Sequence, residues 1–264
     1  MKRSSNFSSL RSVWAFRELL WALVLRNLKV KYQRSWLGFF WTLLNPVLTA
    51  SVLIIVFTHV IRIPIENYWA FLISGYFAWN FMAQCLNAAT YTVAEHAPLA
   101  RSIAFPQEIL IIATAFSRLI EFGIELLLVM LVLGSALHGG IPPSFALVPL
   151  LVILQLLLCL GLQMPVAVLS AFFKDVQHAL PIAIATLFYM SPVFYSADFV
   201  PAWMYDAYLL NPIARVLTLY HDVLYRGEFP SLADLGVATG ISLLTFYLGY
   251  AVFNRSKHLF AEVL

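Results

Sequence analysis

The sequence has few charged residues: 11% of its 264 residues are Asp, Glu, Lys or Arg, whereas 62% are hydrophobic. Soluble globular domains usually carry about 25% charged residues. This composition therefore excludes an ordinary water-soluble domain. The shortage of charge and the excess of apolar residues instead predict an all-α, polytopic protein that folds in a lipid bilayer.

Motifs for several kinds of chemistry are also missing. The sequence has no Gly-x-x-x-x-Gly-Lys-Ser/Thr phosphate loop, no His-Glu-x-x-His zinc motif and no Gly-x-Ser-x-Gly nucleophile motif. Its six histidines are scattered, and its two cysteines, Cys85 and Cys159, lie inside apolar runs, where a thiol acts as a small apolar residue. We therefore expect no catalytic residues, no metal site, no disulfide framework and no cofactor in this chain.

Long apolar runs predict six membrane-spanning helices. A helix needs about 20 residues to cross a hydrocarbon core of about 30 Å. Two of the runs are shorter than the others, and one is long enough but carries Arg118, Glu121 and Glu125, which gives it a polar face. The predicted spans are 36–61, 68–93, 109–137, 145–173, 179–197 and 235–253.

Lysines and arginines fall mainly on one side of the predicted membrane. With six spans, twelve of them lie in the N-terminal arm or in segments on its side, and three, Arg62, Arg215 and Arg226, lie opposite. Because positive residues favour the cytoplasmic side, we expect both termini to be cytoplasmic. The net charge of +3 reflects this asymmetry, so we expect no nucleic-acid partner.

The segments outside the spans predict a single membrane domain, 36–254, between a cytoplasmic N-terminal arm, 1–35, and a cytoplasmic C-terminal tail, 255–264. In the arm, one helical face carries Trp21, Leu25, Leu28 and Tyr32. This pattern predicts an interfacial helix that lies along the bilayer. Leu19, Leu23 and Val30 interrupt the opposite, polar face, so we expect protein to cover part of that side.

Residues 207–224 are a poor candidate for a seventh span. Only about fifteen residues separate Asp206 from Asp222, and Pro212 and Arg215 interrupt them. An arginine at mid-membrane costs about 2.5–3.5 kcal/mol on an insertion scale. We therefore expect short helices between spans 5 and 6 that do not cross the membrane.

Two of the predicted spans carry a polar face. In the second span, Asn80, Gln84, Asn87 and Tyr91 recur at helical spacing; such a face either joins helices by hydrogen bonds or lines the path of a hydroxyl-rich substrate. In the third span, Arg118, Glu121 and Glu125 share one face, and Arg118 is placed to pair with Glu121 one turn away. This face is either a structural ion pair or a substrate contact, and it cannot point at lipid.

Aromatic residues make up 15% of the chain. Many are expected in the interfacial belt or the core, yet flat rings also pack well against sugar C–H faces and give contact area without fixed bonds. Trp41, Tyr189, Phe194 and Tyr195 are therefore candidates for a sugar path, together with Asn80, Gln84 and Asn87.

Between spans 2 and 3 lies "AEHAPLARSIAFPQEIL", residues 94–110. Pro98 stands at a plausible helix start, and Pro106 ends the segment before the next span begins. The segment is either an ordinary interhelical loop or a compact helix that acts as a rigid lever for a cytoplasmic partner.

Five segments, in this order and over nearly the whole chain after residue 18, resemble the permease subunit of ABC-type polysaccharide exporters, a type-2 ABC transmembrane domain. These exporters move O-antigen, capsule and teichoic-acid chains. Each segment alone is weakly specific, and their order and spacing carry the resemblance. The segments are "RNLKVKYQRSWLGFFWTLLNP" (26–46), "LARSIAFPQEIL" (99–110), "FFKDVQHALP" (172–181), "SPVFY" (191–195) and "LLNPIARVLTLYHDVL" (209–224).

The resemblance implies a homodimer in the bacterial inner membrane that encloses a channel and binds two copies of a separate ATPase, which holds the ATP and Mg. It makes 17–35 a cytoplasmic interface helix and 196–232 an outer gate region. It also implies that about 94–108 couples to the ATPase. The coupling residues would be Glu95, His96, Pro98, Leu99, Arg101, Ser102 and Phe105.

The function we expect is ATP-driven export of a lipid-linked polysaccharide such as an O-antigen, with this chain shaping the path. An ABC permease for another lipid or for a drug is the alternative. A gradient-driven carrier would need mid-membrane ionisable groups and related halves; only Glu121 and Glu125 offer the first, and no repeat is visible. An intramembrane enzyme would need a paired nucleophile and base, which the sequence lacks.

Overall fold

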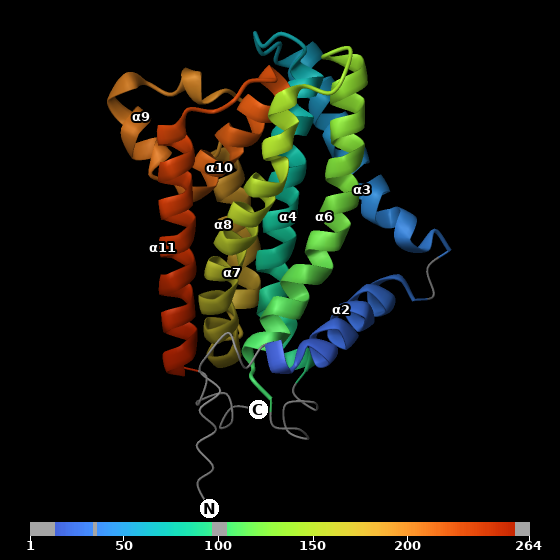
Figure 1. The fold of residues 1–264 in the computed structure, drawn as a ribbon, viewed down its shortest axis with the longest axis vertical. Coiled ribbons are helices and arrows are strands. Elements are labelled where there is room, and N and C mark those ends of the chain that lie inside the picture. The colour runs from blue at the N-terminus through green and yellow to red at the C-terminus, as the bar shows by residue number, and fades with distance from the viewer. Residues whose placement is uncertain (1–13, 34–35, 97–104, 257–264) are drawn as a thin grey trace, which may run out of the picture.

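The computed structural model describes residues 14–33, 36–96 and 105–256, and all regular structure within them is helical. Long helices form an upright bundle, and α2 lies across one end of it (Figure 1). We call this the α2 end and the opposite one the α9 end. The helices are α2 (Arg17–Tyr32), α3 (Trp41–Ile55), α4 (Tyr68–Glu95), α6 (Glu108–Ala136), α7 (Val148–Phe172), α8 (Val176–Tyr189), α9 (Ala202–Leu209), α10 (Pro212–Tyr220) and α11 (Leu232–Ser256).

Short helical turns extend or connect several of these helices. The 3-10 turns are η1 (Gly38–Phe40), η3 (Pro143–Leu147) and η4 (Ala197–Phe199), and the π-helical turns are η2 (Val56–Val60) and η5 (His221–Arg226). Gly38 has a positive φ of 49°, a conformation that glycine adopts readily. The first predicted span therefore begins as a regular helix only at Trp41.

Each of the six predicted spans contains a helix. Within the described residues, four helical stretches are long and apolar enough to cross a membrane: Trp41–Val60, Glu108–Ala136, Pro143–Phe172 and Leu232–Ser256. The structure thus confirms an all-helical, multi-pass membrane protein, and the count of six stays a prediction.

The helices of the other two predicted spans, α4 and α8, do not meet this criterion of length and hydrophobicity, for different reasons. The 28 residues of α4 reach about 42 Å, but Asn80, Gln84 and Asn87 make its middle polar. The 14 residues of α8 reach only about 21 Å, less than the hydrocarbon core. Its helix ends at Tyr189, eight residues before the predicted end of that span, because the chain turns at Met190–Pro192.

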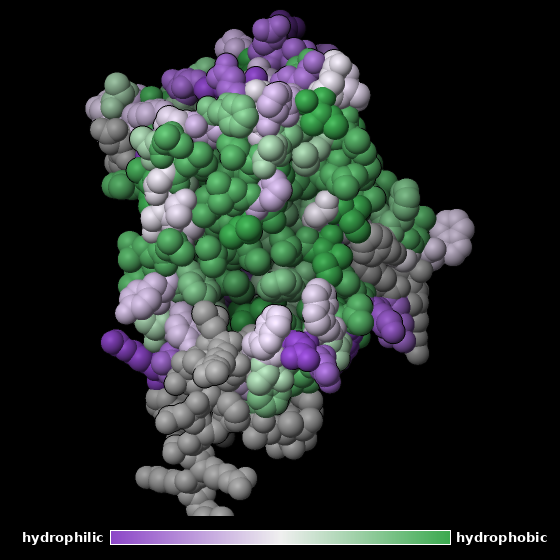
Figure 2. Space-filling view, in the orientation of Figure 1, coloured by the Kyte–Doolittle hydropathy of each residue, from purple (hydrophilic) through white to green (hydrophobic). Residues whose placement is uncertain are grey.

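A band of hydrophobic surface crosses the middle of the bundle. Figure 2 shows this band between hydrophilic residues that gather towards the two ends. Exposed large side chains such as Val52, Leu131 and Leu248 come from three different helices. Soluble monomers rarely expose an apolar surface of this extent, so the band marks the part of the molecule that faces lipid.

The centre of the bundle is α4, which packs against α6, α7, α8 and α10. Two glutamines of α7 reach its backbone: Nε2 of Gln155 donates to the carbonyl of Ala78 at 2.6 Å, and Nε2 of Gln163 donates to that of Cys85 at 2.7 Å. Hydrogen bonds of this kind contribute about 0.6 kcal/mol each within membranes. They fix the register of α7 on α4.

The segment between α8 and α11 forms short helices, as predicted. α9 has 8 residues and α10 has 9, which gives lengths of about 12 and 14 Å. Neither helix is long enough to cross a membrane. Both lie towards the α9 end of the bundle (Figure 1).

The interface helix α2 packs on α6 through its middle turn. Leu23 and Val24 are buried in a small core with Phe105, Ile109 and Leu110. Trp21 and Leu25, from the predicted membrane-facing side, are half-exposed. Protein therefore covers the side where Leu23 interrupts the polar pattern. It also covers Leu28 of the predicted bilayer side, and the Trp21 ring contacts Phe116 of α6, so that predicted side faces protein in part.

Glycines let α7 and α11 approach each other closely. A Cβ on Gly249 would fall on the carbonyl oxygen of Gly161, and one on Gly161 would meet the backbone of Thr245 and Phe246. Small residues allow helix backbones to approach closely in membranes. This contact attaches α11, the last helix, to the bundle.

Gly249→Ala is therefore expected to destabilise the protein by about 1–3 kcal/mol, the usual cost of overpacking. The thermal unfolding midpoint of the purified chain in detergent measures this effect. Gly240→Ala is the matched control, because a Cβ at Gly240 of the same helix meets open space. Equal unfolding midpoints for the two variants would contradict the glycine contact.

Candidate functional site

A polar cavity of about 660 Å³ lies at the α2 end, between α2, α4 and α6. Its walls carry amide, hydroxyl and charged groups from all three helices. They bring together residues from three predicted sets: the sugar path, the coupling segment and the polar face. The predicted residues in the wall are Gln84, Asn87, Glu95, His96, Arg118 and Glu121.

An ion cluster forms one side of this cavity. Nζ of Lys31 lies 2.8 Å and 2.9 Å from the two carboxylate oxygens of Glu121, and a guanidinium nitrogen of Arg118 lies 3.1 Å from the same carboxylate. The predicted Arg118–Glu121 pair is thus confirmed. Oε1 of Gln84 lies 3.5 Å from both cations, at the limit of a hydrogen bond.

Lys31 was missed as a site residue from the sequence because 90 positions separate it from Glu121. No periodic pattern links residues on different helices; the only available signal was a lysine near the end of the interface helix. Glu121 is buried, whereas the Lys31 side chain is 33% exposed. Burial and the nearby Arg118 lower the pKa of Lys31, and its bonds to Glu121 oppose that shift.

The predicted polar faces divide between two regions. Gln84, Asn87 and Glu121 meet at the large cavity, but Asn80 is not in its wall and Glu125 lines a separate apolar cavity of about 190 Å³ between α3, α4 and α6. The side chains of Glu125 and Asn80 face each other inside the bundle, and Oε1 of Glu125 and Nδ2 of Asn80 are both buried. Asn80 and Glu125 therefore belong to the bundle interior rather than to the large cavity.

Only part of the predicted coupling segment is described. Nδ1 of His96 lies 2.9 Å from the carbonyl of Thr92, and burial lowers the pKa of His96, although this hydrogen bond opposes the shift. Phe105 is buried against α2 and α6 in the small core around Leu23 and Val24. Pro98, Leu99, Arg101 and Ser102 lie outside the described residues.

Three of the four predicted aromatic residues come together near the α9 end. The ring of Phe194 lies 5.8 Å from Tyr189, 5.0 Å from Tyr195 and 5.0 Å from Phe57. Trp41 is the first residue of α3, which η2 continues. Phe57, which belongs to the cluster, lies 16 residues further on, about 24 Å along the helix axis from Trp41. Trp41 is half-exposed and does not join the cluster.

A chain of hydroxyl groups connects this aromatic cluster to α9. The Tyr208 hydroxyl donates to the Tyr195 hydroxyl at 3.0 Å, and the Tyr195 hydroxyl donates to the carbonyl of Tyr189 at 3.2 Å. These bonds join α9 to the end of α8. The sequence did not single out Tyr208, because its partner lies in a different element.

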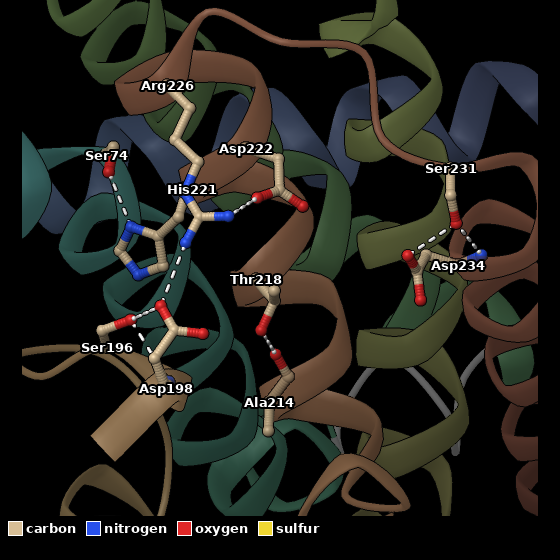
Figure 3. A network of polar contacts seen from close by, with 10 residues as sticks. All are labelled: Ser74, Ser196, Asp198, Ala214, Thr218, His221, Asp222, Arg226, Ser231 and Asp234. Carbon is tan, nitrogen blue, oxygen red and sulfur yellow. Dashed lines mark hydrogen bonds and ion pairs between the residues drawn. The ribbon is translucent and has the colours of Figure 1, made fainter. Parts of the chain in front are cut away.

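His221 joins the same turn to α4. Its Nε2 donates to the carbonyl of Pro192 at 2.8 Å, and its Nδ1 lies 2.8 Å from the Ser74 hydroxyl, as Figure 3 shows for Ser74. Its ring stacks on Phe71 at 4.1 Å. A Cβ at position 75 would collide with the imidazole, so Gly75 makes room for it.

Comparison with known proteins matches residues 18–225 to the ABC-2 type transporter family. The O-antigen export system permease protein RfbA of Myxococcus xanthus is 29% identical over 96% of this chain and 97% of its own. RfbA of Klebsiella pneumoniae is 28% identical over 94% of this chain and 95% of its own. The polysialic acid transport protein KpsM of Escherichia coli is 22% identical over 89% of this chain and 92% of its own.

Lys31→Met is expected to loosen α2 from α6, because it removes one of the two cations that the described residues place on the buried Glu121. Since Lys31 is partly exposed, we expect a loss of about 1–2 kcal/mol rather than the 3–5 kcal/mol of a fully buried pair. Hydrogen–deuterium exchange of residues 17–32 measures this local opening.

Lys29→Met, an exposed residue of the same helix, is the matched control and should leave the exchange unchanged. The charge swap that combines Lys31→Glu with Glu121→Lys should restore part of the protection. Equal exchange rates in Lys31→Met and the wild-type chain would show that the ion cluster does not hold α2.

Proposed function

Because the chain belongs to the ABC-2 type transporter family, we propose that it is the channel-forming permease of an ATP-driven exporter of a lipid-linked polysaccharide, such as an O-antigen. The observation that carries this proposal is the match over nearly the full length of both chains to O-antigen export permeases. The chain itself is a transport subunit, and ATP hydrolysis belongs to a separate partner chain.

We place the protein in the bacterial inner membrane with six spans and both termini in the cytoplasm. In this arrangement α4 is the second span and α8 the fifth, and the turn from Met190 to Ser196 completes the depth that α8 lacks. The α2 end is then cytoplasmic and the α9 end faces outward. Two copies of this chain with two ATPase subunits form the exporter.

The large cavity supports entry of a glycan at the cytoplasmic end. Its walls carry the side-chain amides of Gln84 and Asn87 and the hydroxyl of Tyr91. Amides and hydroxyls both donate and accept hydrogen bonds, which matches the hydroxyl groups of a sugar. The exposed Tyr189, with Phe194 and Tyr195, then offers ring faces near the exit.

ATP binding by the partner can shift the permease between two states only through contacts that differ between them. We assign these contacts to the interface helix α2 and to the segment 94–108. Because α2 packs on α6 through Leu23 and Val24 and pairs Lys31 with Glu121, a displacement of α2 carries α6 with it. The wall of the cavity then moves with the ATPase.

Export of another lipid or of a drug is the second candidate. The apolar cavity of about 190 Å³ beside Glu125 favours it, because its walls are mostly aliphatic. This cavity is far smaller than the polar one, so the polysaccharide remains the preferred substrate.

Asn87→Leu is expected to lower glycan export about tenfold at an unchanged amount of protein in the membrane, since a polar group of the path loses its hydrogen bonds to sugar hydroxyls. Asn87 is preferred to Gln84, which also contacts the ion cluster. Surface glycan in cells that contain the partner ATPase measures export.

Ser135→Ala is the control. Among the described residues the Ser135 hydroxyl donates to carbonyls of its own helix, just as the Asn87 amide donates to the carbonyl of Ala83. Wild-type export by Asn87→Leu would remove this residue from the path.

Tyr189→Ala is expected to slow glycan export several-fold while lowering the abundance of the protein much less. Tyr189 is 66% exposed, so it contributes little to the core, and its ring is free to pack on passing sugars. Tyr247→Ala tests an equally exposed tyrosine on α11. Parallel losses of export and abundance in Tyr189→Ala would mean that the ring only supports the fold.

A further inference from the structure

A second polar cavity, of about 220 Å³, lies near the α9 end between η4, α9, α10, η5 and the start of α11. Charged side chains from four of these elements meet in its wall. They are Asp198, Arg215, Asp222, Arg226 and Asp234, with Tyr205 of α9 beside them. None of these residues belongs to the predicted path.

The charged groups of this cavity hold one another in place. Arg226 bridges Asp198 and Asp222, with nitrogen–oxygen distances of 3.2 Å to each (Figure 3). Arg215 pairs with Asp234 at 2.7 Å. Asp198 and Asp234 also accept hydrogen bonds from serine hydroxyls. Asp198 accepts from Ser196 at 2.8 Å, and Asp234 accepts from Ser231 at 2.6 Å. The wall is thus preorganised before any ligand binds.

Exposure varies across the cavity. The side chains of Arg215 and Asp222 are 16% and 18% exposed, whereas those of Arg226 and Asp198 are 46% and 65% exposed. The first two therefore form the floor and the other two the mouth. Nε of Arg215 is buried and has no hydrogen-bond partner among the described residues. Buried donors in proteins are normally hydrogen-bonded, so this nitrogen needs an acceptor.

The charges restrict the class of ligand. Three carboxylates face two guanidinium groups, and burial lowers the pKa of the adjoining His221 to about 4, which leaves its imidazole neutral at neutral pH. The net charge of the wall is negative, which disfavours phosphate and other anions. The described residues also contain no group of three His, Cys, Asp or Glu arranged for a metal ion, and the arginines already occupy the carboxylates.

A neutral ligand rich in hydroxyl groups satisfies both kinds of wall group. Carboxylates accept hydrogen bonds and guanidinium groups donate them, and a hydroxyl does both. The volume of 220 Å³ corresponds to about seven water molecules at about 30 Å³ each, the scale of one pyranose ring. Phe71 and His221, stacked on each other, add ring surface to the wall.

We propose that this cavity is a saccharide subsite that binds one neutral sugar unit of the exported glycan near the exit. This inference rests on the proposed function for the identity of the glycan. A sugar held there opposes backward sliding of the chain between transport steps.

Saturation-transfer NMR on the full-length chain in lipid nanodiscs tests the subsite without ATP. The probes are methyl α-mannoside, methyl β-galactoside and methyl N-acetyl-β-glucosaminide, with glucose 6-phosphate as the anionic comparison. We expect at least one neutral glycoside to bind and the phosphate ester to bind less well.

Asp222→Asn should weaken glycoside binding about tenfold, because it removes the charge from a hydrogen-bond acceptor in the cavity floor. Tyr205→Phe, which removes a single hydroxyl, should weaken binding about threefold and guards against misfolding of the first variant. Glu228→Gln is the control, since Glu228 is a neighbouring carboxylate outside the wall.

Three results would overturn the subsite: no binding of any neutral glycoside, tighter binding of the phosphate ester, or wild-type binding in both Asp222→Asn and Tyr205→Phe. Glycan export in cells is measured in parallel with glycoside binding. A chain that exports glycan but binds no glycoside refutes only the subsite. A chain that binds glycosides at this cavity but exports no glycan refutes only the proposed function.

Discussion

The hydrocarbon core of a bilayer offers no water to polar groups, so a polar group placed there is costly unless it has a partner inside the protein. This constraint accounts for much of the structure. Gln155 and Gln163 donate to carbonyls of α4 and thereby fix α7. Glu121, buried on α6, is neutralised by Arg118 of its own helix and by Lys31, which comes from outside the spans. Satisfying one buried carboxylate thus attaches the interface helix to the bundle.

That attachment links structure to mechanism. A permease that hydrolyses no ATP has to receive motion at its cytoplasmic surface and pass it to the substrate path. The elements that meet at the large cavity are α2, α4 and α6. Under the proposed function, the surface that receives the motion and the wall of the path therefore share one ion cluster. At the other end, the Tyr208–Tyr195 bond and the His221 contacts hold the short helices against the bundle. The two ends are joined by α4, which carries Ser74 near one and Gln84 near the other.

Periodicity and charge in the sequence predicted the helices well, because a membrane span has a large, continuous apolar signal. They also predicted the Arg118–Glu121 pair, since residues three apart on a helix are neighbours. The contacts between helices were not predictable in this way: Lys31 with Glu121, His221 with Ser74 and Tyr208 with Tyr195 join positions whose distance in the chain carries no information. For the same reason one periodic face, Asn80 to Asn87, divided between the cavity and the interior. The family resemblance, by contrast, was readable from ordered local segments and is confirmed by the match over residues 18–225.

Under the proposed function, this chain and a separate ATPase move a lipid-linked polysaccharide across the membrane. The most direct measurement reconstitutes the chain and its partner ATPase in proteoliposomes, with labelled lipid-linked glycan and ATP added outside. Movement into the lumen is read as protection of the glycan from an added glycosidase. Export by this pair should give protection that grows with time, requires ATP and is absent with a catalytically inactive ATPase. Glycan that stays fully sensitive to the glycosidase, while ATP is hydrolysed by an intact complex, would contradict it.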